Sequence, residues 1–557
     1  MKAAKTARAS KIMTAAQGIV EILKTEGIRN VFCVPGESYL PLLDALHDEE
    51  DIRVISARHE GGASFMAEGY AKSSLTPGVV MATRGVGAAN LSIGVHTAYQ
   101  DSTPMVVFLG QVHSKFRGRE GFQEVDLDRY FQHIAKWTVE VKDPERIPEL
   151  VQRAFRVAQT GRPGPVVVSL PEDVLPKSAE MRFGPAAIKP KPAPAMEEIH
   201  EVEKLLAAAE KPLIIAGGGV KSAQAEEALL AFAEQYQIPV MAAFRRHDVF
   251  PNDHPLYVGH LGLGTHKNIL QTAAEAGVLL AIGTRLSEVT TQDYQLIAPE
   301  QSLIHIDISY DTIGQVYAPD AGIVADAREA LLALTNMTLS GNWEKWAKKR
   351  HHAYQEASRL EVSHKDGINK HTMKVMSDLL PEDALFTNDA GNFAGWLHAF
   401  YLFKQEHTYV GPTSGAMGYG MPAALGAKLA FPEKPVIALS GDGGFMMTMQ
   451  ELETAVRYQI PVICIVYNNQ MYGTIRMHQE IHYPEKVIGT DLGMVSFKDM
   501  AASVGADGYV ADTSETFAEA LKQALAKNHP AVIEVLTNKE QISVSSTITQ
   551  IRNRAKK

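Results

Sequence analysis

Short, uninterrupted apolar runs alternate with amphipathic helical stretches along almost the whole chain. Runs such as residues 79–83, 105–110 and 165–170 are rich in β-branched residues and end at glycine or polar turns. Strands that lack polar alternation are typical of parallel sheets covered by helices on both faces. The sequence therefore predicts an α/β fold built from doubly wound parallel sheets.

The chain of 557 residues is long enough for three or four domains, at about 150 residues per domain. Residues 184–194 are too rich in proline for a helix and predict a stiff linker. We expect a first domain at 1–183, a central domain at 184–340, a helical connector at 341–369 and a third domain at 370–557. The first and third blocks have a similar size and strand rhythm, which indicates two related sheets. For the polar segment 543–557 we expect either a closing flap or disorder.

Charge and composition exclude several kinds of partner. The net charge is −10, and the only basic run lies within residues 2–11, which argues against nucleic acid and membrane partners. The chain has no run of 18 apolar residues and no secretory signal, and the basic run favours a solvated tail over a transit signal. Cys33 and Cys464 lie in apolar strand-like runs and read as core residues. We expect a cytoplasmic enzyme.

A glycine-rich turn carries the strongest local signal. A predicted strand at 436–440 runs into Gly-Asp-Gly-Gly at 441–444, and we expect the next helix at about 449–458. Glycines after a strand let backbone N–H groups approach a phosphate. Asp442 and Asn469 end successive strands, where open α/β sheets bind ligands. Their oxygens, with a nearby backbone carbonyl, suit Mg²⁺ bridging a diphosphate.

A glutamate at a strand-to-helix junction is a second, independent signal. The predicted strand at 53–57 leads to Glu60, which is followed by a helix. In the simplest interpretation this carboxylate only stabilises the helix N-terminus. The alternative is a carboxyl placed for proton transfer.

Together these motifs resemble the thiamine diphosphate (ThDP) enzymes. Gly-Asp-Gly followed by a helix and Asn-Asn resembles the ThDP motif, and nearly the whole chain is similar to the acetolactate synthase branch, which includes related carboligases and decarboxylases. The stretches that carry this resemblance lie at 34–37, 83–90, 100–105, 110–112, 122–126, 161–165 and 415–424.

The resemblance implies three α/β domains: a pyrimidine-binding domain, a central domain and a diphosphate-binding domain. It implies a cofactor between the first domain of one subunit and the third of another, hence a dimer or a dimer of dimers. The implied activity is ThDP- and Mg²⁺-dependent decarboxylation and carboligation of small 2-oxoacids such as pyruvate.

The resemblance also assigns residue roles. Glu60 would hydrogen-bond N1′ of the aminopyrimidine and so promote loss of the C2 proton. Asp442 and Asn469, with the main chain near Met471, would hold Mg²⁺. Met417 would be the apolar wedge that bends the cofactor, although a core gap-filler is the simpler interpretation. The other implied residues are Gly36, Glu37 and Asn90 on the pyrimidine side; Gly391, Asn392, Gly441, Gly443 and Gly444 around the diphosphate; Phe122 and Gln123 at the substrate end; and His113, which would transfer a proton or be a structural loop histidine.

Two departures from the biosynthetic pattern concern the substrate. His478 stands where biosynthetic acetolactate synthases carry a tryptophan that favours 2-oxobutyrate. Glu172 replaces the lysine of the Leu-Pro-Lys-Asp segment. The first departure disfavours branched-chain amino-acid synthesis as the specific role.

A third departure concerns the residues that would contact FAD. Such a flavin would have a structural role only, because carboligation transfers no electrons overall. Residues 217–219, Arg162 and Arg285 match the flavin pattern. Ala-Phe-Arg-Arg-His at 243–247 and Gly-Leu-Gly-Thr at 262–265 replace flavin-contacting turns, and the second arginine of the flavin segment is missing. The two arginines of the 243–247 loop would either close the cavity or receive an acidic group, such as an ADP moiety or a substrate carboxylate. Both outcomes, with and without FAD, stay open.

We therefore expect an acetolactate synthase-like carboligase. The alternatives are a 2-hydroxyacyl-CoA or oxalyl-CoA-type lyase or decarboxylase, or another 2-oxoacid decarboxylase, and tight binding of ADP or CoA compounds would favour the CoA type. A non-catalytic ThDP-binding relative would have lost Glu60, Asp442 or Asn469, and all three are present.

Overall fold

The computed structural model describes residues 10–556, which form two compact units. The first unit contains the chain up to Pro190 together with Met421–Pro432 and Thr448–Ile460. The second contains Lys191–Gly420, Glu433–Met447 and the chain from Pro461 onward. Two segments of the third sequence block thus belong to the first unit.

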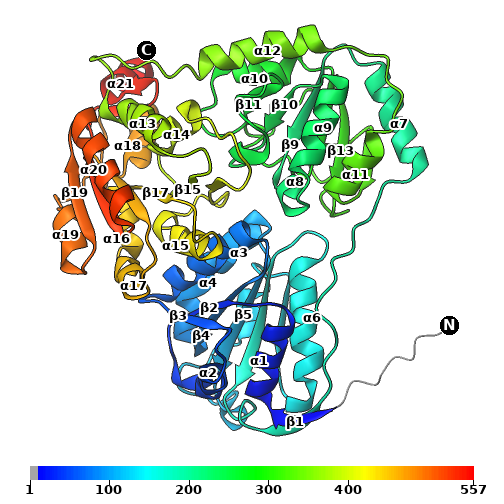
Figure 1. Ribbon diagram of the computed structural model, residues 1–557, viewed down its shortest axis with the longest axis vertical. Helices are drawn as coiled ribbons and strands as arrows, with labels where there is room; N and C mark the ends of the chain where they lie inside the picture. Colours follow the sequence, from blue (N-terminus) through cyan, green and yellow to red (C-terminus); the bar gives the residue numbers. More distant parts are fainter. Residues whose placement is uncertain (1–9, 557) are drawn as a thin grey trace. The chain divides into compact units, whose positions relative to one another are not determined.

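The first unit is built around a six-stranded parallel sheet with the order β3-β2-β4-β5-β7-β6. Strands β2 to β5 of this sheet are labelled in Figure 1. Successive side chains of a strand point to opposite faces. Val106 and Phe108 of β5 accordingly pack in one cluster with α1 and α6, whereas α3 and α4 contact each other and the same central strands, β4 and β5. Covering both faces explains why these strands read as continuous apolar runs. The elements are β2 (Asn30–Cys33), β3 (Arg53–Ser56), β4 (Gly78–Thr83), β5 (Met105–Gln111), β6 (Trp137–Glu140), β7 (Pro165–Pro171), α1 (Ala15–Thr25), α2 (Leu40–His47), α3 (Glu60–Ser74), α4 (Arg84–Asp101), α5 (Leu127–Phe131) and α6 (Ile147–Gln159), with short 3₁₀ turns η1 (Glu37–Tyr39), η2 (Ser114–Phe116) and η3 (Pro144–Arg146).

Two further helices and a small ribbon complete the first unit. Helices α15 (Gly420–Ala430) and α17 (Glu451–Arg457) come from the third sequence block. A Cβ on Gly69 of α3 would lie 2.6 Å from Ala423 Cα of α15, so only glycine permits this helix crossing. Strand β1 (Lys11–Thr14) pairs antiparallel with β8 (Ser178–Met181). Lys11 is the part of the basic N-terminal run that is described; residues 2–9, which we predicted as a solvated tail, lie outside the described residues.

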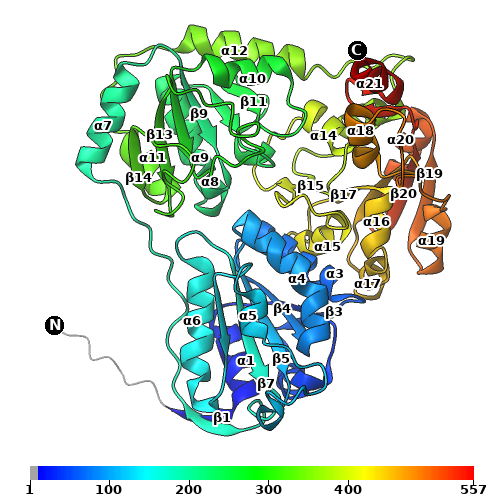
Figure 2. The same cartoon turned by 180° about the vertical axis from the view of Figure 1, so that it is seen from behind.

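A second six-stranded parallel sheet, in the second unit, has the order β11-β10-β9-β12-β13-β14. This is the strand order of dinucleotide-binding sheets. Helix α7 contacts the edge strand β14 and the neighbouring α11 (Figure 2). The elements are β9 (Pro212–Ala216), β10 (Val240–Ala242), β11 (Tyr257–His260), β12 (Val278–Ile282), β13 (Ser302–Asp307), β14 (Ala321–Val324), α7 (Met196–Ala207), α8 (Gly218–Ser222), α9 (Glu226–Tyr236), the turn η4 (His247–Val249), α10 (Lys267–Glu275), α11 (Ala327–Leu334) and the connecting helix α12 (Glu344–Ala357).

A third six-stranded parallel sheet, also in the second unit, has the order β16-β15-β17-β18-β20-β19. Numbered along the chain, the strands of the first and third sheets follow the same order, 2-1-3-4-6-5. The prediction of two related sheets is confirmed. The elements are β15 (Leu385–Asn388), β16 (Tyr409–Val410), β17 (Val436–Gly441), β18 (Ile463–Asn468), β19 (Asp507–Ala511), β20 (Ala531–Leu536), α13 (Ile368–Leu379), α14 (Ala394–Phe400), α16 (Asp442–Thr448), α18 (Gly473–His482), α19 (Phe497–Ser503) and α20 (Ser514–Lys527).

The helix expected at about residues 449–458 corresponds to α17, but the sequence did not predict the helix that precedes it. Helix α16 starts at Asp442, breaks after Thr448, and α17 follows. The Asp442 carboxylate accepts the backbone N–H of Gly443 at 2.8 Å and adds negative charge to the first turn. Because the helix begins at Asp442, Gly443 and Gly444 lie in its first turn and not in the turn that we predicted.

The C-terminal segment is ordered, so the disordered alternative is wrong for its described residues. It forms strands β21 (Gln541–Ser543) and β22 (Ser546–Thr547) and helix α21 (Ile548–Ala555), which packs against α18. Arg552 of α21 binds the buried Glu480 of α18 with two hydrogen bonds, of 2.6 and 2.9 Å. These bonds lower the pKa of Glu480 to about 2, so the pair stays ionised near neutral pH and anchors the C-terminus.

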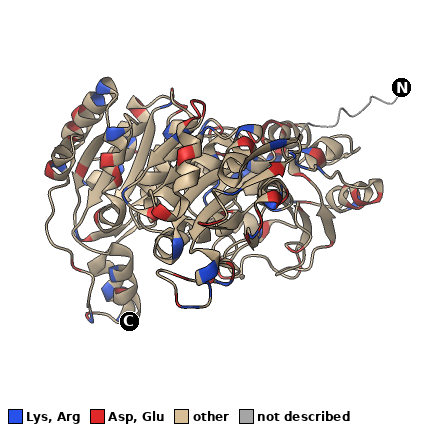
Figure 3. Cartoon of the chain, turned by 90° about the horizontal axis from the view of Figure 1, so that it is seen from below, with Lys and Arg blue, Asp and Glu red and all other residues tan. Residues whose placement is uncertain are grey.

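Composition led to expectations about the two cysteines, about membrane-spanning segments and about the distribution of charge. Cys33 and Cys464 are buried and free, as predicted. Among residues 10–556, no helix combines the length and apolarity that crossing a membrane requires. Basic and acidic residues are interspersed over the face drawn in Figure 3.

Candidate active site

The strand order creates a ligand-binding edge in each unit. In the first sheet β2 and β4 are neighbours, but the chain continues from them to opposite sides, to β3 and to β5. The same reversal occurs between β15 and β17 in the third sheet. Open α/β sheets bind ligands at the carboxyl ends of such strands. We call the residues around the first reversal, with Glu60, the pyrimidine-side site, and those around the second the diphosphate-side site.

Glu60 and Asn90 meet in the pyrimidine-side site. Glu60 is the first residue of α3 and is only 9% exposed. Asn90 of α4 donates its side-chain N–H to Glu60 Oε2 at 2.9 Å. A Cβ at Gly87 would lie 3.2 Å from Glu60 Oε1, so a glycine here leaves room beside the carboxylate. Two residues that the resemblance assigned to the pyrimidine are thus joined by a hydrogen bond.

The turn before Glu60 is held by Glu451, which sequence reasoning missed. The buried Glu451 carboxylate accepts the backbone N–H groups of Arg58 at 3.1 Å and His59 at 2.9 Å. A Cβ on Gly62 would lie 2.5 Å from Glu451 Oε1, so the second glycine after Glu60 makes room for this carboxylate. Burial raises the pKa of Glu451, and its hydrogen bonds offset part of that rise. No local pattern links the two segments, because they lie far apart in sequence.

Arg84 is the second missed residue of the pyrimidine-side site. Its side chain is 9% exposed and donates to Glu37 at 3.0 Å and to Glu172 at 2.7 Å. The available signal was Glu172 in place of lysine, together with the basic Arg84 in the 83–90 stretch. A lysine at 172 would face the Arg84 guanidinium, so the acidic residue compensates the arginine electrostatically. Gly36, which precedes Glu37, approaches Thr83 so closely that a Cβ would lie 2.5 Å from Thr83 Cβ.

The residues predicted at the substrate end have different surroundings. The Phe122 ring is 73% exposed and lies 6.0 Å from the Arg84 guanidinium. Gln123 has a left-handed backbone (φ +64°), and its carbonyl accepts the N–H of Gly85 at 3.1 Å. The His113 ring nitrogen Nδ1 accepts the N–H of Lys115 at 3.2 Å and so caps η2. That contact matches the structural interpretation of His113.

The diphosphate-side site gathers the predicted metal ligands. Asp442 is 6% exposed and directly follows β17 as the first residue of α16, and Asn469 follows the paired strand β18. Burial raises the pKa of Asp442, and the N–H groups of Gly443, Gln470 and Met471 offset part of that rise. Asn469 Oδ1 accepts the N–H of Met471 at 3.2 Å. Asp442 and the 469–471 turn therefore lie together, and their oxygen donors fit Mg²⁺ with a diphosphate.

The glycines of this site are also required by packing. A Cβ on Gly443 would lie 2.6 Å from the Tyr472 ring, and one on Gly444 would lie 2.5 Å from Asp389 Oδ2. Gly391 has φ +155°, and a Cβ there would lie 2.5 Å from the Phe393 ring. Gly441 is less constrained, with the Phe393 ring 3.3 Å from the Cβ position. The glycine pattern is thus compatible with a phosphate, but packing alone accounts for three of its members.

Met417 and Asn392 border the diphosphate-side site. The Ala416 carbonyl accepts the N–H of Ala390 at 3.1 Å, which places the Met417 turn beside the loop after β15. The glycines that flank this turn, 415 and 418, have φ of +69° and +74°. The Asn392 side chain donates to the Ile542 carbonyl at 2.9 Å and accepts from Thr474 at 3.0 Å. It therefore ties the C-terminal hairpin to α18, which leaves its backbone to contact a diphosphate.

The glycine turn of the flavin pattern is closely packed by its neighbours. A Cβ on Gly217 would lie 2.3 Å from the Gly283 carbonyl, so close packing requires this glycine. Arg246 Nε lies 2.7 Å from the Cβ position of Gly218, and the Phe244 ring lies 2.8 Å from that of Gly262. The two segments that depart from the flavin pattern therefore pack against each other and against the glycine turn, which does not fit a flavin. Arg162, in the first unit, donates to Ser102 and Tyr99 at the end of α4.

Sequence comparisons agree with this architecture. Family models of the thiamine pyrophosphate enzymes match the chain with the N-terminal TPP binding domain at residues 13–130, the central domain at 199–334 and the C-terminal TPP binding domain at 389–535. The probable acetolactate synthase large subunit of Methanocaldococcus jannaschii is 35% identical over 548 residues, covering 94% of this chain and 92% of that protein. The acetolactate synthase large subunit of Lactococcus lactis is 33% identical, with 96% and 95% covered. Acetolactate synthase isozyme 1 large subunit of Escherichia coli is 32% identical, with 97% of each chain covered. The chain belongs to the thiamine pyrophosphate enzyme family, and these full-length relatives are acetolactate synthase large subunits.

Proposed function

We propose that this protein is a ThDP- and Mg²⁺-dependent 2-oxoacid carboligase and decarboxylase of the acetolactate synthase type. The observation that carries the proposal is the hydrogen-bonded pair of Glu60 and Asn90, held by the buried Glu451. Relatives named acetolactate synthase align with nearly the whole chain and support the same reaction class.

The chain's own groups have separate tasks in this proposal. When bound, ThDP supplies a thiazolium that takes up the electrons released by loss of CO₂ from a 2-oxoacid. Glu60 holds and returns a proton at N1′ of the pyrimidine, and Asn90 keeps the carboxylate oriented. Asp442 and Asn469 would hold Mg²⁺ and with it the diphosphate. Exclusion of water around the bound cofactor would favour reaction with a second 2-oxoacid over protonation by solvent.

A CoA-type lyase or decarboxylase is a second candidate, favoured by one observation. The central sheet has the strand order of dinucleotide-binding sheets, and Arg246 lies against Gly218 of its glycine turn. A guanidinium at that position could bind a phosphate. Saturable binding of ADP or CoA would favour this candidate.

The first experiment is an assay of pyruvate consumption with ThDP and Mg²⁺. Carbon dioxide and acetolactate are followed together, the latter as acetoin after acid treatment. We expect acetolactate. Carbon dioxide alone would indicate simple decarboxylation. If ThDP binds but pyruvate is not consumed, the proposal fails and the CoA-type donors are tested.

We also propose a homodimer or a dimer of dimers as the active form. Each unit carries only part of the machinery, with Glu60 in the first and Asp442 in the second. A two-fold assembly would pair the pyrimidine-side site of one protomer with the diphosphate-side site of its partner.

We predict that the purified protein lacks stoichiometric flavin. The physical reason is the packing of Phe244 against Gly262 and of Arg246 against Gly218. Flavin absorbance, and flavin fluorescence after heat release, measure the content directly. One FAD per chain would contradict the prediction and would require the 243–247 loop to move.

A further inference from the structure

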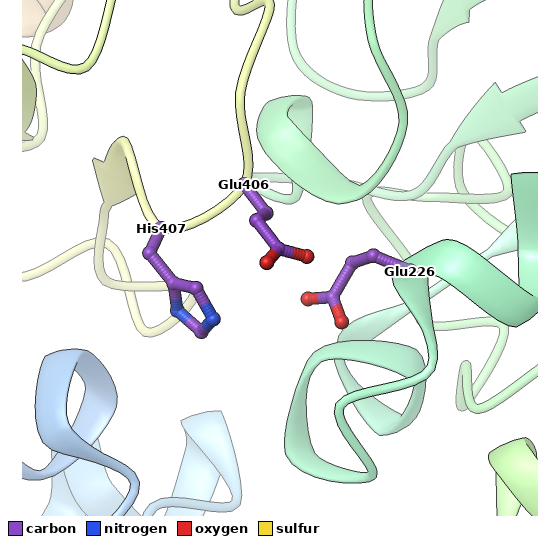
Figure 4. Close-up of side chains that lie close together, drawn as sticks. All are labelled: Glu226, Glu406 and His407. Carbon is purple, nitrogen blue, oxygen red and sulfur yellow. The ribbon is translucent and has the colours of Figure 1, made fainter.

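Three side chains with metal-binding atoms converge in the second unit, apart from the residues assigned to ThDP. Glu226, Glu406 and His407 each offer one ligand atom, and these atoms lie within 4.8 Å of one another. Figure 4 shows the three side chains directed toward a common point. Glu226 is the first residue of α9, next to the central sheet, whereas the other two precede β16, the edge strand of the third sheet. The cluster thus connects α9, beside the central sheet, with the segment that leads into the third sheet.

Glu226 has a buried carboxylate oxygen that lacks a hydrogen-bond partner among the described residues. It is only 8% exposed, and its Oε1 is buried with no hydrogen-bond partner. A buried carboxylate oxygen without a partner is costly, so natural proteins seldom leave one. Burial raises the pKa of Glu226 to about 7, and the charge of Lys221 offsets part of that rise.

Neighbouring cations do not supply the missing partner. Among the described residues, neither Glu226 nor Glu406 forms an ion pair with a lysine or arginine. Lys221, the nearest in sequence to Glu226, pairs with Asp248. Lys434 donates to the His407 carbonyl at 3.2 Å. The two carboxylates therefore lack a protein counter-charge at contact distance.

The donor set selects a class of ion. Two carboxylate oxygens and an imidazole nitrogen suit Zn²⁺ and similar first-row divalent ions, whereas Mg²⁺ and Ca²⁺ prefer oxygen donors alone. Two carboxylates balance the charge of one divalent ion. Ligand atoms about 2.0–2.2 Å from a shared ion lie roughly 3–3.5 Å apart. Rotation of the exposed Glu406 side chain would close the remaining gap, and water would complete the coordination shell.

We propose that Glu226, Glu406 and His407 bind a divalent transition-metal ion of the Zn²⁺ type. The ion would tie α9 to the segment that leads into β16. A tie already exists beside it, because Asp248 of η4 accepts the N–H groups of Thr408 and Tyr409 at 3.1 Å. The metal would be structural and distinct from the Mg²⁺ expected at Asp442, so the inference does not depend on the proposed reaction.

The test is a Zn²⁺ titration of untagged, chelator-treated holoenzyme kept in excess Mg²⁺ and ThDP. A chromogenic chelator competes for the ion, and bound zinc is counted by elemental analysis. We expect one tightly bound Zn²⁺ per wild-type chain. Glu226→Gln and His407→Gln should each weaken binding by more than about 100-fold, beyond the effect of losing an outer-shell partner.

Two matched controls isolate the cluster. Glu227→Gln changes the neighbouring, exposed carboxylate of α9. His482→Gln changes an exposed histidine whose ring lies 6.2 Å from that of His478 on the same helix, a pair that could take up zinc weakly. Both control variants should still bind one Zn²⁺ per chain tightly. The proposal is overturned if wild type binds no tight Zn²⁺, or if Glu226→Gln and His407→Gln bind it as wild type does. If one of these two variants fails to fold, the other still decides.

Discussion

Glu60→Gln is expected to lower kcat by about 10²–10⁴-fold, the usual contribution of a positioned acid–base group. Glutamine has the same shape, and its carbonyl oxygen can still accept the Asn90 N–H that Glu60 accepts at 2.9 Å. The variant therefore loses the exchangeable carboxyl proton but keeps the local packing. Steady-state kinetics measure the loss, and exchange of the ThDP C2 proton, followed by NMR, assigns it to the proton-transfer step.

A binding measurement separates this role from a structural one. We expect the ThDP dissociation constant of Glu60→Gln to stay within a few-fold of wild type. Glu145→Gln, an exposed carboxylate of the same unit, is the matched control and should keep full turnover. Normal turnover of Glu60→Gln would show that this glutamate is not the proton-transfer group.

Asp442→Ala is expected to abolish measurable turnover through loss of the metal and diphosphate. The substitution removes a charged oxygen donor that is 6% exposed and faces the 469–471 turn. Losing an outer-shell partner typically costs 10–100-fold in metal affinity, so losing a direct ligand should cost more than about 100-fold. Mg²⁺-dependent ThDP binding, measured by calorimetry, checks this expectation.

The control for this variant lies in the same unit. Asp499→Asn alters an exposed aspartate of α19 and should bind ThDP like wild type. Retention of Mg²⁺-dependent ThDP affinity in Asp442→Ala would place the metal elsewhere.

Mixing the two inactive variants tests the shared-site assembly. If each site combines Glu60 of one protomer with Asp442 of its partner, half the sites of a mixed dimer are intact. A statistical mixture should then recover about a quarter of wild-type turnover. If both residues act from the same chain, no activity returns.

The predictions from sequence succeeded where a feature depends on neighbouring residues. Continuous apolar runs indicated buried parallel strands, and the six-stranded sheets have them at nearly the predicted residues. The apolar runs at 105–110 and 165–170, for example, correspond to β5 (Met105–Gln111) and β7 (Pro165–Pro171). The helix that begins at Asp442 was missed because its glycine-rich sequence is typical of a turn, whereas in the structure the Asp442 carboxylate accepts a backbone N–H of the first helical turn.

A candidate site residue could be identified from the sequence when it lay in a recognisable motif. Glu60 and Asn90 come from separate motifs, yet both lie where strands of one sheet end, and the fold joins them. Their catalytic roles remain predictions for the variants above.

Sequence alone determined the alternation of strands and helices, the relation between the first and third sheets, and the polar residues at the strand ends. Tertiary structure alone decided that Glu451 holds the turn before Glu60, that Arg84 compensates Glu172, and that Glu226 meets His407. The physical reason is range. Periodicity and turn chemistry act over a few residues, whereas a buried carboxylate finds its partner only after distant segments have packed together.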